Sequence, residues 1–159
     1  MKKLLLILLC VPLIFSCGEK NVNDGEKINK LKLRTIDTTF SNGVHYIGGW
    51  LNNKMSGFGE VTYPDGGNYI GEFENGMANG NGTAYYSDGS NYVGQFVNNQ
   101  KQGKGTYSLH MILGGVEHFF YSYKGDFYNN QYNGYGKMTY ENGTVEEGLW
   151  ENGEFMEGK

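Results

Sequence analysis

From residue 46 to the end of the chain, apolar and polar residues alternate in short runs. Pairs such as Asp65-Gly66, Asp88-Gly89 and Asn142-Gly143 separate the runs. Alternation with a period of two places successive side chains on opposite faces of a β-strand, and these pairs favour the tight turns that join antiparallel strands. The pattern therefore predicts an all-β domain of antiparallel hairpins, with one face rich in aromatic residues and the other more polar.

The hairpins recur with a fixed period. Tyr46, Tyr69 and Tyr92 follow one another at intervals of 23 residues, and Tyr123 and Glu146 are again 23 apart. The step from Tyr92 to Tyr123 is 31 residues long, because extra residues are inserted there. A period of this length is typical of repeat architectures, in which each unit becomes stable only when it stacks on its neighbours.

Each unit carries glycine and aromatic residues at fixed distances from its first residue. Glycine follows two residues later, at Gly48, Gly71, Gly94, Gly125 and Gly148. An aromatic residue follows four residues later, at Trp50, Phe73, Phe96, Phe127 and Trp150. A turn pair led by asparagine comes next, at residues 52–53, 75–76, 98–99, 129–130 and 152–153. A G-x-G follows at residues 57–59, 80–82, 103–105 and 134–136. Since glycine weakens a strand, we expect these positions to make room for a neighbouring ring to lie flat against the backbone.

The alternation of side chains places the recurrent rings on one face, where we expect them to stack from unit to unit into a continuous core. The predicted core residues are Tyr46, Trp50, Tyr63, Tyr69, Phe73, Tyr86, Tyr92, Phe96, Tyr123, Phe127, Tyr140 and Trp150. The expected fold is an elongated single antiparallel meander of about ten short strands. It consists of a cap strand at 35–45 and of units 46–68, 69–91, 92–122, 123–145 and 146–159.

The pattern Y-x-G-x-[WF]-x-N-[GN]-x(4)-G-x-G resembles the MORN (membrane occupation and recognition nexus) repeat family. The resemblance extends over residues 46–159, with glycine and aromatic residues in phase in all five units. It implies a protein that binds or scaffolds other molecules. In enzymes these repeats accompany a separate catalytic domain, for which this chain has no room, so we expect no catalytic residues and no cofactor.

The first 17 residues have a different character. Lys2 and Lys3 precede an apolar run that is too short to cross a membrane, which is the pattern of a secretory signal. Its end, Ile14-Phe15-Ser16-Cys17, resembles a bacterial lipobox, in which Cys17 receives the lipid. The alternative is an ordinary secretory signal in which Cys17 is incidental. Residues 18–34 are polar and are expected to form a flexible tether, so the first reading predicts a lipid-anchored protein of the bacterial cell envelope, periplasmic or surface-facing.

The period breaks at residues 108–122, which are unusually apolar and contain the turn pair Gly114-Gly115. We expect a hairpin whose arms extend past their neighbours. One interpretation, which we favour, is that it caps or folds back over the aromatic layer. The other is an exposed tip that binds a partner, since insertions in repeat arrays often lie on the binding face. The candidate partner-binding residues are Met111, Ile112, Leu113, Phe119 and Phe120.

Charge narrows the classes of partner. Residues 46–159 hold 6 basic and 13 acidic residues, a net charge of −7. Nucleic acids and anionic lipid headgroups both require clustered lysine and arginine, so we expect no nucleic acid, and contact with a membrane only through the N-terminal lipid. The three histidines, His45, His110 and His118, lack further ligands at recognisable spacing, and we predict no metal site.

These observations favour a non-catalytic interaction or scaffold protein with a protein partner. The main alternative is a carbohydrate-binding module, because aromatic-glycine repeats also occur in choline- and glucan-binding proteins. Exposed rings at Trp50, Phe73 and Phe96 would favour sugar binding, whereas buried rings would favour a scaffold. A weaker alternative is the resemblance to antitoxin-like bacterial proteins built from MORN-type repeats, against which the secretory signal argues.

Overall fold

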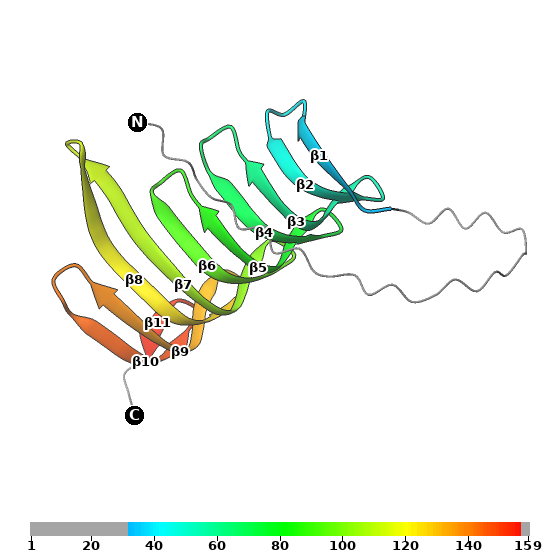
Figure 1. The fold of residues 1–159 in the computed structure, drawn as a ribbon. Helices are drawn as coiled ribbons and strands as arrows, with labels where there is room; N and C mark the ends of the chain where they lie inside the picture. Colours follow the sequence, from blue (N-terminus) through cyan, green and yellow to red (C-terminus); the bar gives the residue numbers. More distant parts are fainter. Residues whose placement is uncertain (1–31, 157–159) are drawn as a thin grey trace, which may run out of the picture. The chain divides into compact units, whose positions relative to one another are not determined.

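The computed structural model describes residues 32–156, and the predicted signal segment 1–17, Cys17 and most of the tether 18–34 lie outside them. Eleven antiparallel strands form one open sheet in which the spatial order of the strands is their order in the chain (Figure 1). The predicted all-β meander is therefore confirmed. The strands are β1 (Arg34–Thr39), β2 (His45–Leu51), β3 (Lys54–Thr62), β4 (Asn68–Glu74), β5 (Met77–Tyr85), β6 (Ser90–Val97), β7 (Gln100–Leu113), β8 (Val116–Tyr128), β9 (Gln131–Tyr140), β10 (Val145–Glu151) and β11 (Glu154–Met156). Within the described part of the chain, no helix is long and apolar enough to span a membrane.

Asparagine and glycine form the turns inside the units as the sequence predicts. Asn98 and Asn99, which join β6 to β7, have φ values of 50° and 66°, and the other asparagine-led pairs are alike. Both central residues of a type I′ turn need such left-handed φ values. The turns between units use a different device, in which Asp65 Oδ1 accepts the N–H of Gly67 at 3.0 Å, and Asp88 does the same for Ser90 at 2.9 Å. The recurrent aspartates are thus engaged in closing turns.

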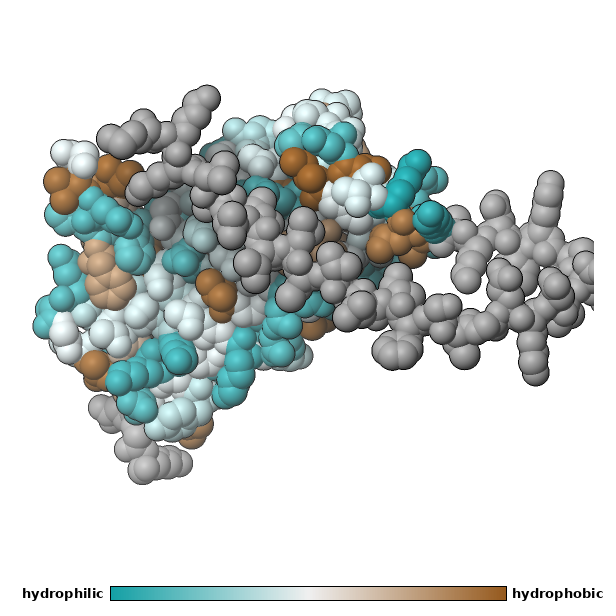
Figure 2. All heavy atoms as spheres, in the orientation of Figure 1, coloured by the Kyte–Doolittle hydropathy of each residue, from teal (hydrophilic) through white to brown (hydrophobic). Residues whose placement is uncertain are grey.

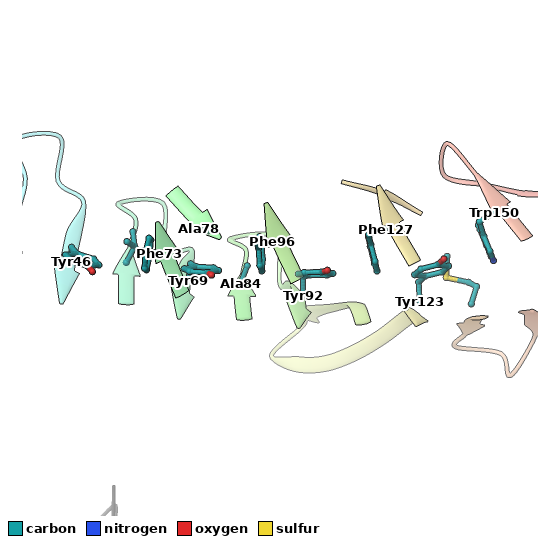
Figure 3. Packing of buried hydrophobic residues seen from close by; sticks show 12 residues of the cluster. Tyr46, Tyr69, Phe73, Ala78, Ala84, Tyr92, Phe96, Tyr123, Phe127 and Trp150 are labelled. Carbon is teal, nitrogen blue, oxygen red and sulfur yellow. The ribbon is translucent and has the colours of Figure 1, made fainter. Parts of the chain in front are cut away.

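Aromatic rings from successive units form one row along one face of the sheet. Figure 3 shows the tyrosine rings lying between upright phenylalanine and tryptophan rings. Neighbouring rings meet edge to face, with centroids 4.9 to 5.5 Å apart. The buried rings of this row are Tyr46, Tyr69, Phe73, Tyr92, Phe96, Tyr123, Phe127 and Trp150. Each edge-to-face pair adds about 0.5–1.5 kcal/mol to the stabilisation from burial, so stacked units stabilise one another.

The two glycines of each G-x-G have different roles. The first, represented by Gly80 with a φ of 107°, lies where the register between β4 and β5 shifts, between the pairs Gly71–Gly82 and Phe73–Ala78. The second, Gly82, lies under the ring of Tyr69, where a Cβ atom would meet the ring atoms at 2.4 to 2.6 Å. The expected space for a flat ring is therefore confirmed at the second glycine, whereas the bulge at the first glycine was not predicted.

The register shift also gives the tyrosine hydroxyl its partner. Tyr69 Oη donates to the carbonyl oxygen of Glu72 at 3.0 Å, and Tyr46, Tyr92 and Tyr123 make the same bond to the residue three positions later. A buried hydroxyl without a partner would destabilise the fold, so the bulge removes this penalty. The tyrosine ring, the glycine beneath it and the bulge therefore depend on one another.

Two predicted core residues are not in the core. The side chains of Tyr63 and Tyr86 are 45% and 38% exposed. Both follow the last residue of their strand and lie at the turn between units, beyond the row of packed rings. Trp50 and Tyr140 are half-buried. The prediction was wrong for Tyr63 and Tyr86 because alternation assigns a face but does not show where along the strand the packed layer ends.

Candidate interaction surfaces

The inserted hairpin projects beyond the rest of the sheet. Pairing with β6 ends at Leu109 and pairing with β9 ends at Tyr121, so residues 110–119 pair only with each other. Phe120 is an unpaired bulge residue in β8, and its carbonyl oxygen accepts the N–H of Glu141 at 2.8 Å. The bulge fixes the base of the projecting part, and the ribbon beyond it has two free edges.

The tip of this hairpin is apolar and open to solvent. Ile112 is 75% exposed, Leu113 51% and Val116 59%. Brown, hydrophobic spheres mark the tip at the upper left of Figure 2. Met111 is also exposed, whereas Phe119 and Phe120 are half-buried. The interpretation of the tip as a cap over the aromatic layer is therefore wrong, although the arms nearer the sheet do pack, with Tyr107 and Tyr121 against the core.

The two histidines of the hairpin belong to neighbouring cross-strand pairs and therefore lie on opposite faces of its ribbon. His110 is opposite Phe119 and His118 is opposite Met111, so the two do not face each other across the hairpin. His110 Nδ1 lies 3.2 Å from Glu117 Oε1, and the more distant His45 lies 2.9 Å from Asp37 Oδ1. No group of three or more potential metal ligands occurs among residues 32–156.

A hollow of about 530 Å³ lies on the aromatic face at the unit formed by β4 and β5. It arises because Ala78 and Ala84 occupy positions where the other units carry larger side chains. The residues equivalent to Ala78 are Met55, Lys101, Tyr132 and Phe155, and those equivalent to Ala84 are Val61, Tyr107 and Met138. The presence of two alanines in one unit is visible in the sequence and indicates missing side-chain volume. The repeat pattern alone did not show that this space would remain open.

The walls of the hollow come from neighbouring rings. Tyr69, Phe73 and Phe96 contribute buried aromatic surface, while Tyr63 and Tyr86, the two rings outside the packed row, line it from the turn side. Asp65, Asn68, Ser87 and Asn99 are the other polar side chains around it. The hollow is thus mostly apolar, with polar groups near the turns at both ends of the strands.

Lys101 lies beside the hollow among three tyrosine rings. Its Nζ is 5.2 Å from the ring centroid of Tyr86, 5.7 Å from that of Tyr92 and 4.8 Å from that of Tyr107. Burial lowers the pKa of Lys101, and the nearby carboxylate of Asp88 partly opposes that shift. The strand register places every other lysine between residues 46 and 156 away from the aromatic face. Lys101 is therefore the single cation of that face within the described repeats.

The opposite face carries paired charges. Lys104 Nζ lies 2.7 Å from the carboxylate of Asp126, and Lys137 Nζ lies 3.6 Å from Glu147. Exposed pairs of this kind contribute little to stability. They do neutralise Lys104 and Lys137, so these two lysines leave little uncompensated positive charge on that face.

Comparison with known families agrees with the repeat seen in the fold. The family model of the MORN repeat matches residues 46–68, 69–91, 92–109 and 123–145, which together cover more than half of the chain. The third match ends at residue 109, the last residue of β7 that pairs with β6, and the fourth begins at residue 123, two residues after β8 starts to pair with β9. No curated protein matches the chain.

Proposed function

The chain belongs to the MORN repeat family, and from this premise we propose that it is a non-catalytic interaction module held at the bacterial cell envelope by a lipid on Cys17. The observation that carries the proposal is the exposed apolar tip of the β7–β8 hairpin. Ile112, Leu113 and Val116 are exposed there, and they pair only with residues of the same hairpin. Burying a side chain of this size against a partner contributes about 1.5–3 kcal/mol each.

The non-catalytic part of the proposal rests on how the recurrent polar groups are used. The aspartates at 65 and 88 close turns, and the core tyrosine hydroxyls donate to backbone carbonyls. Groups committed to structural hydrogen bonds are not free to act as acids, bases or nucleophiles on a substrate. The recurrent polar groups of the repeat therefore stabilise the sheet and its turns.

Partner capture from the native envelope tests the tip. Chains in which Ile112 and Leu113 are both changed to serine should lose the partner protein that the unchanged chain retains. Phe58→Ser is the matched control, because Phe58 is 69% exposed on a strand far from the hairpin. Equal recovery of the same partner by the tip variant and the control would refute the role of the tip.

The anchor is tested separately. Cys17→Ala should release the protein from the membrane fraction and abolish its labelling by a radioactive fatty acid, whereas Cys10→Ala should change neither. Retention of the Cys17→Ala chain in the membrane fraction would overturn the lipid anchor without affecting the proposal for the tip.

Carbohydrate binding remains a second candidate because of two rings. Phe73 and Phe96 are 6% and 4% exposed and cannot offer a face to a sugar, but Tyr63 and Tyr86 are exposed at equivalent positions of adjacent units. Replacing both tyrosines with alanine should then abolish retention on insoluble cell-wall glycan. If the unchanged chain shows no retention on that glycan, this candidate is eliminated.

A further inference from the structure

We propose that the hollow at Ala78 and Ala84, together with Lys101, is a binding site for a segment of a partner protein that presents a bulky apolar side chain next to a carboxylate. This inference rests on the proposed role as an interaction module and adds the chemistry of the ligand. It concerns a different surface from the hairpin tip. An experiment that refutes one of the two sites therefore does not refute the other.

The shape of the hollow points to an apolar side chain. In the other units the equivalent space is filled by residues of the chain itself, such as Met55 and Tyr132, which pack against the core. In the β4–β5 unit that volume is open, and Tyr69, Phe73 and Phe96 are among the residues that line it. A partner side chain entering it would gain the contacts that these residues make in their own units.

The charge beside the hollow points to a carboxylate. Lys101 is the one cation on the aromatic face of the described repeats, in a region of net charge −7. Its ammonium group is partly removed from water and faces three rings, so an incoming carboxylate would meet less competing solvent than at an exposed lysine. No other lysine between residues 46 and 156 lies on this face, so Lys101 is the position to which a carboxylate of the ligand is attracted.

The lining favours a peptide over a sugar in this hollow. A sugar ring would bring several hydroxyl groups over a floor of Ala78, Ala84 and aromatic rings, where they would lose water without gaining partners. A peptide segment can place its apolar side chain on that floor. Its backbone then lies towards the polar side chains near the turns, such as Asn99 and Ser87.

An array of randomised hexapeptides, probed with the purified full chain, tests the inference. The unchanged chain should enrich peptides with leucine, methionine or an aromatic residue next to aspartate or glutamate. Ala78→Met fills the hollow with the side chain found at the same position of the first unit, and should weaken all of these peptides at least tenfold. Lys101→Met should weaken the acidic peptides about tenfold, or ~1.4 kcal/mol, and bring them level with their asparagine or glutamine counterparts.

Lys104→Met is the matched control, since Lys104 is three residues away but on the opposite face. It should bind the array as the unchanged chain does. Circular dichroism spectra equal to that of the unchanged chain establish that each variant is folded. The inference is overturned by the absence of enriched peptides, by undiminished binding to Ala78→Met, or by identical behaviour of Lys101→Met and Lys104→Met. Displacement of the peptides by octanoate at equal concentration would also overturn it, because it would assign the hollow to small apolar acids.

Discussion

Replacing Gly71 with alanine tests how the tyrosine ring holds the sheet together. A Cβ atom built at Gly71 would lie 2.5 Å from Tyr69 Oη, 2.6 Å from the carbonyl oxygen of Asn81 and 2.6 Å from the Cα of Gly82. Real Cβ atoms do not approach other atoms this closely, so either the ring or the neighbouring strand must move.

The ring has little freedom to move. Tyr69 is 4% exposed, with Phe73 and Phe96 at centroid distances of 5.1 and 5.0 Å. Its hydroxyl donates to the carbonyl oxygen of Glu72 at 3.0 Å. Overpacking costs about 1–3 kcal/mol and the lost hydrogen bond about 0.5–1.5 kcal/mol. Because alanine restricts the unfolded chain more than glycine does, the substitution also adds about 0.5–1 kcal/mol to the free energy of unfolding.

The free energy of unfolding should therefore fall by about 2 kcal/mol, measured by urea denaturation followed by circular dichroism. The melting temperature should fall by about 4–8 °C. Gly148→Ala is the matched control, because Gly148 has the same position in its unit but Glu146 replaces the tyrosine. There the new Cβ meets only the ring of Phe155, at 3.1 Å, and the change should stay within about 0.5 kcal/mol. Equal effects of the two substitutions would refute the reasoning.

Three further outcomes are expected. Asn99→Gly keeps the left-handed turn but removes the hydrogen bond from the N–H of Ala78 to Asn99 Oδ1, which is 2.7 Å long. The free energy of unfolding, measured by urea denaturation, should fall by about 1 kcal/mol. Asn99→Ala should lower it by about 1 kcal/mol more, because alanine is strained at a φ of 66°. Burial raises the pKa of three core tyrosines to about 12, namely Tyr69, Tyr92 and Tyr123. Because the folded state favours their neutral form, the stability they confer should be complete below pH 10 and lost as the pH rises towards 12; melting temperatures at pH 9, 10, 11 and 12 measure this, and a constant value would contradict it. Replacing residues 110–119 with Asn-Gly should leave the free energy of unfolding within about 0.5 kcal/mol, since these residues pair only with each other.

The hairpin architecture could be predicted because its causes are local. Asparagine and glycine adopt left-handed φ values at low cost wherever they stand, and alternation along a strand assigns each side chain to a face without reference to other strands. The order of the strands followed in the same way, because short turns leave consecutive antiparallel strands no other neighbours. These features are present in every unit, and the repetition made each of them easier to recognise.

The surfaces relevant to binding depended on the tertiary structure. Tyr63 belongs to the aromatic face by alternation, yet it lies outside the core because the packed row ends before the turn. The space at Ala78 stays open only because no neighbouring unit supplies a side chain to fill it. Lys101 meets rings from three different strands or turns, a contact set by how the units stack and not by any short stretch of sequence. Local residue chemistry therefore specified the repeating sheet, whereas packing across strands decided which of its side chains remain available to a partner.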